Sequence, residues 1–231
     1  MKAKMPERTY ELVPAGNHVA RLYSVIHLGT NSFEYMGELK KSDKVRLTFE
    51  LCNERKVFKE GDEPKPFSIS REFGLTMGKK SNLRPFVESY IGTTLSDEEA
   101  YGFDLEDLLG MSCLLNVVHA EKGDKVFANI KSASPLPKGM EAPELFNEKV
   151  VIDVDTTPFD QIEQLPDFIK DKMKSSEEYR ERVAKNQDAG VAPAEEAPIP
   201  PKPIKPKILG GPASHEGEYP QEDINPDDIP F

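Results

Sequence analysis

Apolar and polar residues alternate along several short segments in the first third of the chain. The segment KVRLTFEL at 44–51 alternates at every position, and FSISREF at 67–73 places three apolar residues on one side. A third segment, HVARLYSVIHLG at 18–29, mixes apolar, aromatic and β-branched residues and stops at a Gly-Thr-Asn-Ser run. A period of two is typical of half-buried β-strands, so all three segments are predicted to be strands.

The spacing of apolar residues then changes to that of helices. The segment SNLRPFVESYIG at 81–92 opens on Ser-Asn, has a proline in its first turn and ends on glycine, which predicts a helix. Two shorter segments, 96–102 and 104–110, each open on a capping residue and close on glycine. The segment 113–136 is predicted to form two strands joined around Lys-Gly-Asp at 122–124.

These elements predict a mainly β fold. The pattern itself supports an all-β core with a helical insert between the third and fourth strands. Five strands in this order are typical of the OB fold, a partly open barrel whose strand face and loops bind oligonucleotides or oligosaccharides. A different small barrel remains an alternative.

The region after the hairpin is predicted to end the folded part of the chain. KVVIDVD at 149–155 is read as a sixth, edge-type strand, and the segment 165–187 as helical in two pieces. Ser175 and Glu178 match a capping box, while Glu178/Arg182 and Glu181/Lys185 are spaced as i,i+4 pairs. A solvated helix that ends the domain and a helix that binds a partner are both compatible with this pattern.

Residues 187–231 differ in composition from everything before them. They are rich in Pro, Ala, Gly and acidic residues, so neither helix nor sheet can propagate and too little apolar surface remains to offset the entropy of ordering. We therefore divide the chain into an OB-like domain at 1–155, a helical extension at 156–186 and a disordered acidic tail at 187–231.

Charge is unevenly distributed along the chain, whose net charge is −11 and whose pI is about 5.0. Residues 1–90 hold 16 Lys and Arg against 12 Asp and Glu, residues 91–186 hold 11 against 20, and residues 187–231 hold 3 against 9. Because the first region is mildly basic, the low pI is only a weak argument against nucleic-acid binding.

The sequence also predicts a compartment. Cys52 and Cys113 lack Cys or His neighbours at metal-ligand spacing, which favours buried free thiols in a reducing environment. No apolar stretch approaches the ~20 residues that span a bilayer, and the N-terminus lacks a signal-peptide core. A cytoplasmic protein without a membrane partner is expected.

No motif for catalysis is present in the sequence. There is no Ser/His/Asp or Cys/His arrangement with a supporting motif, no phosphate loop, and no His-Glu pair at metal spacing. We therefore predict a protein that is not an enzyme and that uses no metal or other cofactor, and a nuclease is disfavoured.

Alternation along the first strand defines two faces. The residues expected to face the core are Ala20, Leu22 and Ile26. The residues expected to face outward are Arg21, Tyr23 and Val25. Sequence-independent binding of a single strand needs cations for the phosphates and flat rings for the bases, and the outward set places a cation two residues before a ring.

Further cations and rings lie nearby in the sequence. Phe33 and Tyr35 are expected in a turn before Lys40 and Lys41, and a basic group is expected at the end of the third strand. The predicted DNA-binding residues are Arg21, Tyr23, Phe33, Tyr35, Lys44, Arg46, Arg71, Lys79, Lys80 and Arg84.

The final residues, Asp-Asp-Ile-Pro-Phe, resemble the C-terminal tip of bacterial single-stranded DNA-binding proteins, which also follows a Pro/Gly-rich linker. In that family the tip docks on replication, recombination and repair proteins, whose pocket takes the Phe ring while basic side chains take the carboxylates. The resemblance implies a partner-binding set of Asp227, Asp228, Ile229, Pro230 and Phe231.

The body of the chain resembles a group of tailed-phage replication proteins taken to be phage-encoded single-stranded DNA-binding proteins with an OB fold. The resemblance implies single-stranded DNA and tip-binding proteins as partners, in the host cytoplasm, with a homo-oligomer possible. The body departs from the shorter bacterial OB domain, so the oligomeric state stays open. The alternative is an adaptor that copies the bacterial tip to capture host repair and replication proteins without binding DNA.

Overall fold

The computed structural model of the chain describes residues 12–58, 61–123 and 125–188. In this part, the strands are β1 (Gly16–Tyr35), β2 (Glu38–Lys56), β3 (Lys65–Gly74), β4 (Ser112–Lys122), β5 (Lys125–Ser134) and β6 (Val150–Asp153). The helices are α1 (Leu83–Ile91), α2 (Asp97–Tyr101), the 3-10 helix η1 (Leu105–Leu108), α3 (Phe159–Ile162), α4 (Asp167–Lys174) and α5 (Glu177–Asp188). The predicted tip at 227–231 and most of the predicted tail lie outside the described residues, as does Asp124 of the predicted hairpin turn.

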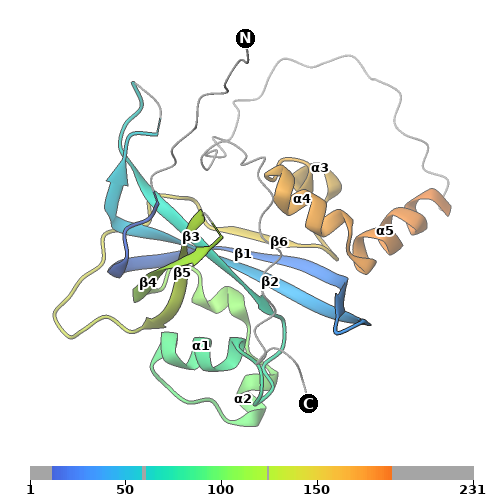
Figure 1. Cartoon of the computed structure of the whole chain (residues 1–231), viewed down its shortest axis with the longest axis horizontal. Coiled ribbons are helices and arrows are strands. Elements are labelled where there is room, and N and C mark those ends of the chain that lie inside the picture. Colours follow the sequence, from blue (N-terminus) through green and yellow to red (C-terminus); the bar gives the residue numbers. More distant parts are fainter. Residues whose placement is uncertain (1–11, 59–60, 124, 189–231) are drawn as a thin grey trace.

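The strands form one sheet in the order β3-β2-β1-β4-β5, with antiparallel neighbours, and β6 pairs parallel to β1. The mainly β fold, the helical insert between β3 and β4, the β4–β5 hairpin and the sixth strand are confirmed. Helices α1 and α2 lie on one side of the sheet, and α3, α4 and α5 lie on the other (Figure 1). Among the described residues, no helix has both the length and the apolar character needed to cross a membrane.

The main hydrophobic core lies between the sheet and α1. Phe49 of β2 contacts the rings of Phe86 and Tyr90, with centroids 6.2 and 5.8 Å apart, and the Tyr90 hydroxyl donates to the Met111 carbonyl at 2.7 Å. Helix α1 ends at Gly92 as predicted, in the left-handed region at φ 74°. A Cβ at Gly92 would lie 2.6 Å from Pro135 Cγ, so glycine also permits close approach to the end of β5.

Strands β3 and β5 contact each other although they are not neighbours in the sheet. Arg71 of β3 lies between them and donates to the carbonyls of Ile130 and Lys131, each at 3.2 Å. Its guanidinium also lies 4.7 Å from the centre of the Phe73 ring. The Arg71 side chain therefore links β3 to β5, which are not hydrogen-bonded to each other through their backbones.

A second hydrophobic core lies on the opposite face of β1, beneath the C-terminal helices. Its buried members are Ile26, Leu28, Ile152, Val154, Ile162, Ile169 and Met173. Helices α4 and α5 therefore have one side covered by β1. The segment 156–186 packs on the sheet through this core.

The two faces of β1 differ from the prediction beyond Leu22. Leu22 pairs with Phe49 and Ser24 with Thr48, so Tyr23 is an extra residue in β1, a β-bulge. The bulge reverses the alternation: Val25, predicted to face outward, is buried in the main core, and Ile26 lies in the second core. The prediction for these two residues was wrong because a single inserted residue exchanges the faces.

The predicted capping box of the last helix is also wrong. Ser176, one residue later than predicted, accepts from the Tyr179 amide at 3.2 Å. Glu178 accepts from the amide of Thr30 at 2.7 Å instead of closing the box. Arg182 contacts the carbonyls of Val154 and Thr157. The Glu181–Lys185 pair is confirmed at 3.6 Å.

A buried ion pair fixes α4 on the sheet. The Glu72 side chain is only 2% exposed and lies 2.9 Å from Arg46 of β2 and 2.7 Å from Lys172 of α4. Burial alone would raise the pKa of Glu72, but the charges and hydrogen bonds of Lys172 and Arg46 outweigh it and lower the pKa. The ionised carboxylate therefore stabilises the fold.

Replacing Glu72 tests this link. Glu72→Gln should lower the free energy of unfolding at pH 7 by about 3 kcal/mol, because two cations lose their buried partner. Since the pKa of Glu72 is lowered, its contribution is fully present above the ordinary glutamate pKa and is lost as pH falls through the lowered value. Urea unfolding at several pH values should show the difference from the parent shrinking in acid.

The matched control is Glu121→Gln, which removes an exposed carboxylate from β4. It should change the free energy of unfolding by no more than about 0.5 kcal/mol. Equal stability of Glu72→Gln and the parent would contradict the assigned role of this pair.

Candidate nucleic-acid interface

The predicted DNA-binding residues separate into cations bonded within the protein, the lysines that follow β3, Tyr23 on the sheet, and residues on a projecting hairpin. Arg21 belongs to the first class. Its guanidinium donates to the carbonyls of Gly110 at 2.6 Å, Pro143 at 2.7 Å and Ala142 at 3.1 Å. Arg21 therefore holds the β5–β6 loop against the start of β4.

Arg46 is covered by α4. Its guanidinium donates to Glu72 and Ser70 and lies 5.0 Å from the centre of the Phe168 ring. Lys44, two residues earlier on β2, is half-buried and pairs in register with glycines of β1 and β3. Of these two predicted residues, Arg46 is therefore packed under a helix.

The predicted basic group at the end of β3 is divided in the structure. Arg84 lies on α1 and contacts Glu88 at 3.1 Å and Asp97 at 2.8 Å, while Lys79 contacts the same Asp97 at 2.9 Å. Lys80 is exposed nearby. Arg71 instead lies on β3, where it contacts β5 as described above.

Tyr23, at the bulge in β1, lies on the outer face of the sheet. Its hydroxyl donates to Ser68 at 3.3 Å, and burial raises its pKa. Buried Glu50 flanks this strip and accepts from the amides of Phe146 and Asn147, each at 2.9 Å. The half-exposed strip around Tyr23 is therefore bordered by the β5–β6 loop at one end and by α4 at the other.

The remaining predicted residues lie on the arm, which we define as residues 29–44, where β1 and β2 extend as a hairpin (Figure 1). Phe33 and Tyr35, predicted in a turn, are in β1; the turn is Met36–Gly37, with φ of 50° and 80°. The long strand results from pairing with β2, which the local sequence did not reveal. Positive φ at both turn residues gives the twist that suits a two-residue hairpin loop.

One face of the arm combines rings with a cation. Phe33 pairs in register with Lys40, and the Lys40 Nζ lies 4.8 Å from the centre of the Tyr35 ring. Residues two apart in a strand share a face, so Phe33, Tyr35 and Lys40 lie together. Met36 and Leu39 at the tip are 86% and 75% exposed. Phe33, Tyr35 and Lys40 are each half-buried, and rings beside an ammonium group can stack on bases and pair with phosphate.

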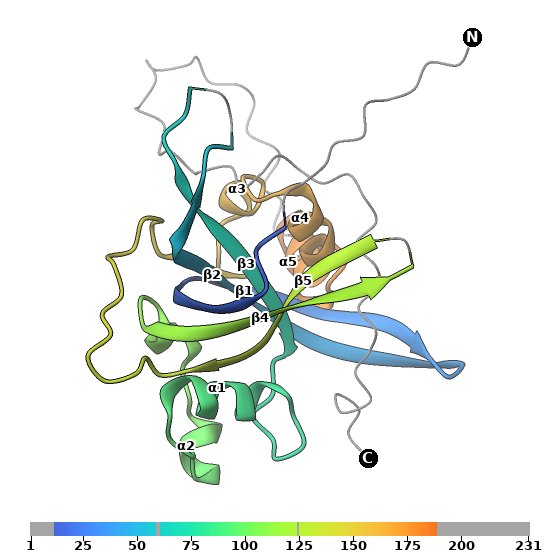
Figure 2. The ribbon, with the colours of Figure 1, turned by 60° about the vertical axis from the view of Figure 1, so that its left-hand side comes forward.

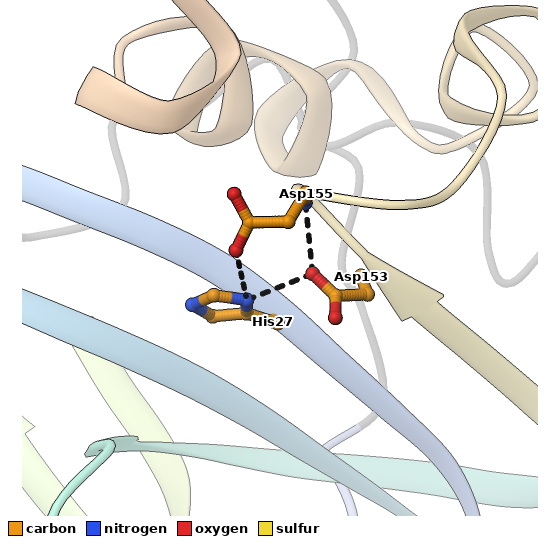
Figure 3. A group of neighbouring side chains, drawn as sticks. All are labelled: His27, Asp153 and Asp155. Carbon is orange, nitrogen blue, oxygen red and sulfur yellow. Dashed lines mark hydrogen bonds and ion pairs between the residues drawn. The ribbon is translucent and has the colours of Figure 1, made fainter. Parts of the chain in front are cut away.

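A group of titratable side chains at the base of the arm was missed by the sequence analysis. His27 of β1 lies 2.8 Å from Asp43 of β2 and 3.0 Å from Asp153 of β6, and 3.8 Å from Asp155 (Figure 3). Burial would lower the pKa of His27, but the hydrogen bonds to Asp43 and Asp153 outweigh it and raise the pKa to about 9.

This group has no signature in the local sequence. His27 and Asp153 are 126 positions apart, and only the parallel pairing of β6 with β1 brings them together. Asp155 lies in the turn that follows β6, where its amide donates to the Asp153 carboxylate at 2.8 Å. His27, Asp153 and Asp155 can hold a metal ion, a grouping that spacing along the sequence did not indicate.

A scan against protein-family models finds no match, and a search of curated proteins finds no significant match.

Arg21 can be tested as an internal residue. Arg21→Ala should lower the free energy of unfolding by about 2 kcal/mol, because water replaces only part of its three bonds to carbonyl oxygens. Lys40→Ala, a cation on the arm, should change it by no more than about 0.5 kcal/mol. Urea unfolding of both variants measures the difference, and equal stability of the two would argue against the assigned role of Arg21.

Proposed function

We propose that this chain is a non-enzymatic, single-stranded DNA-binding protein built on an OB-like barrel. The support for the barrel is topological. An OB barrel places β2 and β4 on either side of β1 and brings β3 beside β5, with a helix between the third and fourth strands. Here β1 pairs with β2 and β4, Arg71 links β3 to β5, and α1 packs beneath.

The observation that carries DNA binding is the face of the arm. The rings of Phe33 and Tyr35 can stack on any base, and Lys40 beside them offers positive charge to the phosphate backbone. In OB folds the loops after β1 and β4 flank the binding site. The arm and the β4–β5 hairpin project toward the same side in Figure 2. Tyr23, on the open strip of the sheet, adds a third ring.

This proposal assigns less of the binding to arginine than the sequence analysis did. Arg21, Arg46, Arg71 and Arg84 each bind carbonyl or carboxylate oxygens of the protein. Their hydrogen-bond donors are therefore largely used within the protein. Stacking on the arm, supported by lysines, is the main source of affinity in this proposal.

Partner recruitment is the second part of the proposal, and sequence likeness alone supports it. The motif Asp-Asp-Ile-Pro-Phe at 227–231 suits a pocket that takes a ring and has basic side chains for the carboxylates. A phage-encoded protein in the host cytoplasm, which coats unpaired strands and recruits replication, recombination or repair proteins, combines both parts. A homo-oligomer is compatible with this function.

Tyr35→Ala tests the arm. It should weaken binding of the full chain to oligo-dT by about 1–3 kcal/mol, the value of one stacked base. The matched control is Tyr101→Ala, which removes a tyrosine that is 95% exposed on α2 and should leave affinity unchanged. Fluorescence anisotropy at increasing salt should also show the parent weakening as salt rises.

The same titration distinguishes the rival function. A full chain without affinity for oligo-dT at low salt would end the DNA-binding proposal and favour the adaptor. Equal losses in Tyr35→Ala and Tyr101→Ala would instead remove the arm as the binding face.

Phe231→Ala tests recruitment separately. It should abolish binding to tip-reading replication or repair proteins, because the buried ring is the anchor, while affinity for oligo-dT stays at the parental value. Surface plasmon resonance with immobilised partner proteins and the anisotropy titration together measure both. Retained partner binding by the variant would contradict the assigned role of Phe231.

A further inference from the structure

The base of the arm gathers three donor atoms from two strands that are distant in sequence. His27 Nδ1 lies 3.0 Å from an Asp153 carboxylate oxygen and 3.8 Å from one of Asp155. One donor atom from each of the three residues lies within 4.8 Å of the others. Figure 3 shows both carboxylates directed at the same edge of the imidazole ring. A single ion can therefore reach all three.

The backbone fixes this arrangement. Asp153 is the last residue of β6 and pairs in register with His27. The Asp155 amide donates to the Asp153 carboxylate at 2.8 Å, which turns the chain so that Asp155 returns toward the ring. Two of the three donors therefore come from a short turn that is anchored to β1.

Asp43 occupies the other nitrogen of the ring. Its carboxylate lies 2.8 Å from His27 Nε2. In metal sites the nitrogen that does not bind metal usually donates to a carboxylate, which fixes the tautomer and the ring orientation. With its Nε2 proton directed to Asp43, His27 presents Nδ1 to the two other aspartates.

The charges around this group leave it negative. Three aspartates surround one imidazole, so the group keeps an excess of negative charge even with the ring protonated. Glu178 and Arg182 from α5 also face this region, but Glu178 binds the Thr30 amide and Arg182 binds two carbonyls.

Solvent can reach the group. The side chains of Asp153 and Asp155 are 42% and 52% exposed, whereas that of His27 is 18% exposed. An ion bound between them would keep open positions for water. The ring nitrogen lies on the protein side and the carboxylates on the solvent side, which gives a partly hydrated ion a direct path of entry.

We propose that His27 Nδ1, Asp153 and Asp155 bind one divalent transition-metal ion, with Asp43 as the residue that orients the imidazole. One nitrogen and two carboxylate oxygens suit Zn²⁺ or Mn²⁺, whereas Mg²⁺ and Ca²⁺ prefer oxygen ligands alone. On binding, Nδ1 releases its proton to solvent and the ion takes its place. The ion would join β1 to the end of β6 at the base of the arm, beside the second core.

Isothermal titration of the full chain with ZnCl₂ and, separately, MnCl₂ tests the site. At least one of these ions should bind tightly with a stoichiometry of one per chain. Asp155→Asn should weaken that binding at least tenfold. Because residue 155 is exposed and asparagine keeps one side-chain oxygen there, the variant should fold as the parent does. Asp43→Asn should weaken it by about 10- to 100-fold, the usual effect of losing an orienting partner.

The matched control is Asp160→Asn, which removes an exposed carboxylate five residues after Asp155 in α3 and should leave affinity at the parental value. Ring ¹⁵N shifts should show the ion on Nδ1 of His27.

Two results would overturn the site. One is an absence of binding by either ion at millimolar concentration. The other is binding that Asp155→Asn and His27→Gln leave unchanged, which would assign it to acidic residues elsewhere in the chain. None of these measurements involves DNA, so they are independent of the proposed function.

Discussion

The bulge at Tyr23 is the feature on which the rest of the structure depends. It lets β1 supply Leu22 and Val25 to the main core and Ile26 to the second core. Without the extra residue, a strand of this length would present one unbroken apolar face, and the C-terminal helices would have no surface to cover. Tyr23 itself lies on the half-exposed strip of the sheet, where its hydroxyl donates to Ser68.

Buried charge holds the outer layer on this sheet. Glu50 binds the amides of the β5–β6 loop, Arg21 binds the carbonyls of that loop, and Glu72 binds α4 through Lys172. These charges are costly to bury, so each has at least one partner of matching chemistry. Several basic residues of the outer face, among them Arg21 and Arg46, therefore serve the fold.

The arm and the proposed metal site are physically connected. His27 lies where the arm leaves the sheet, and its partners come from β2 and from the end of β6. A bond network at this position limits how far the arm can turn relative to the helices on the second core.

The sequence by itself determined the strands, the helical insert, the β4–β5 hairpin and the sixth strand, because alternation, capping residues and turn residues act over a few neighbouring positions. It predicted a turn at Phe33 and Tyr35, whereas both residues lie in β1 and the turn follows at Met36–Gly37. Only the tertiary structure decided the burial of Val25, the internal use of Arg46, and the meeting of His27 with Asp153. The burial of Val25 depends on the bulge, the covering of Arg46 depends on α4, and the meeting of His27 with Asp153 depends on the pairing of β6 with β1. None of these three features leaves a periodic signal in the local sequence.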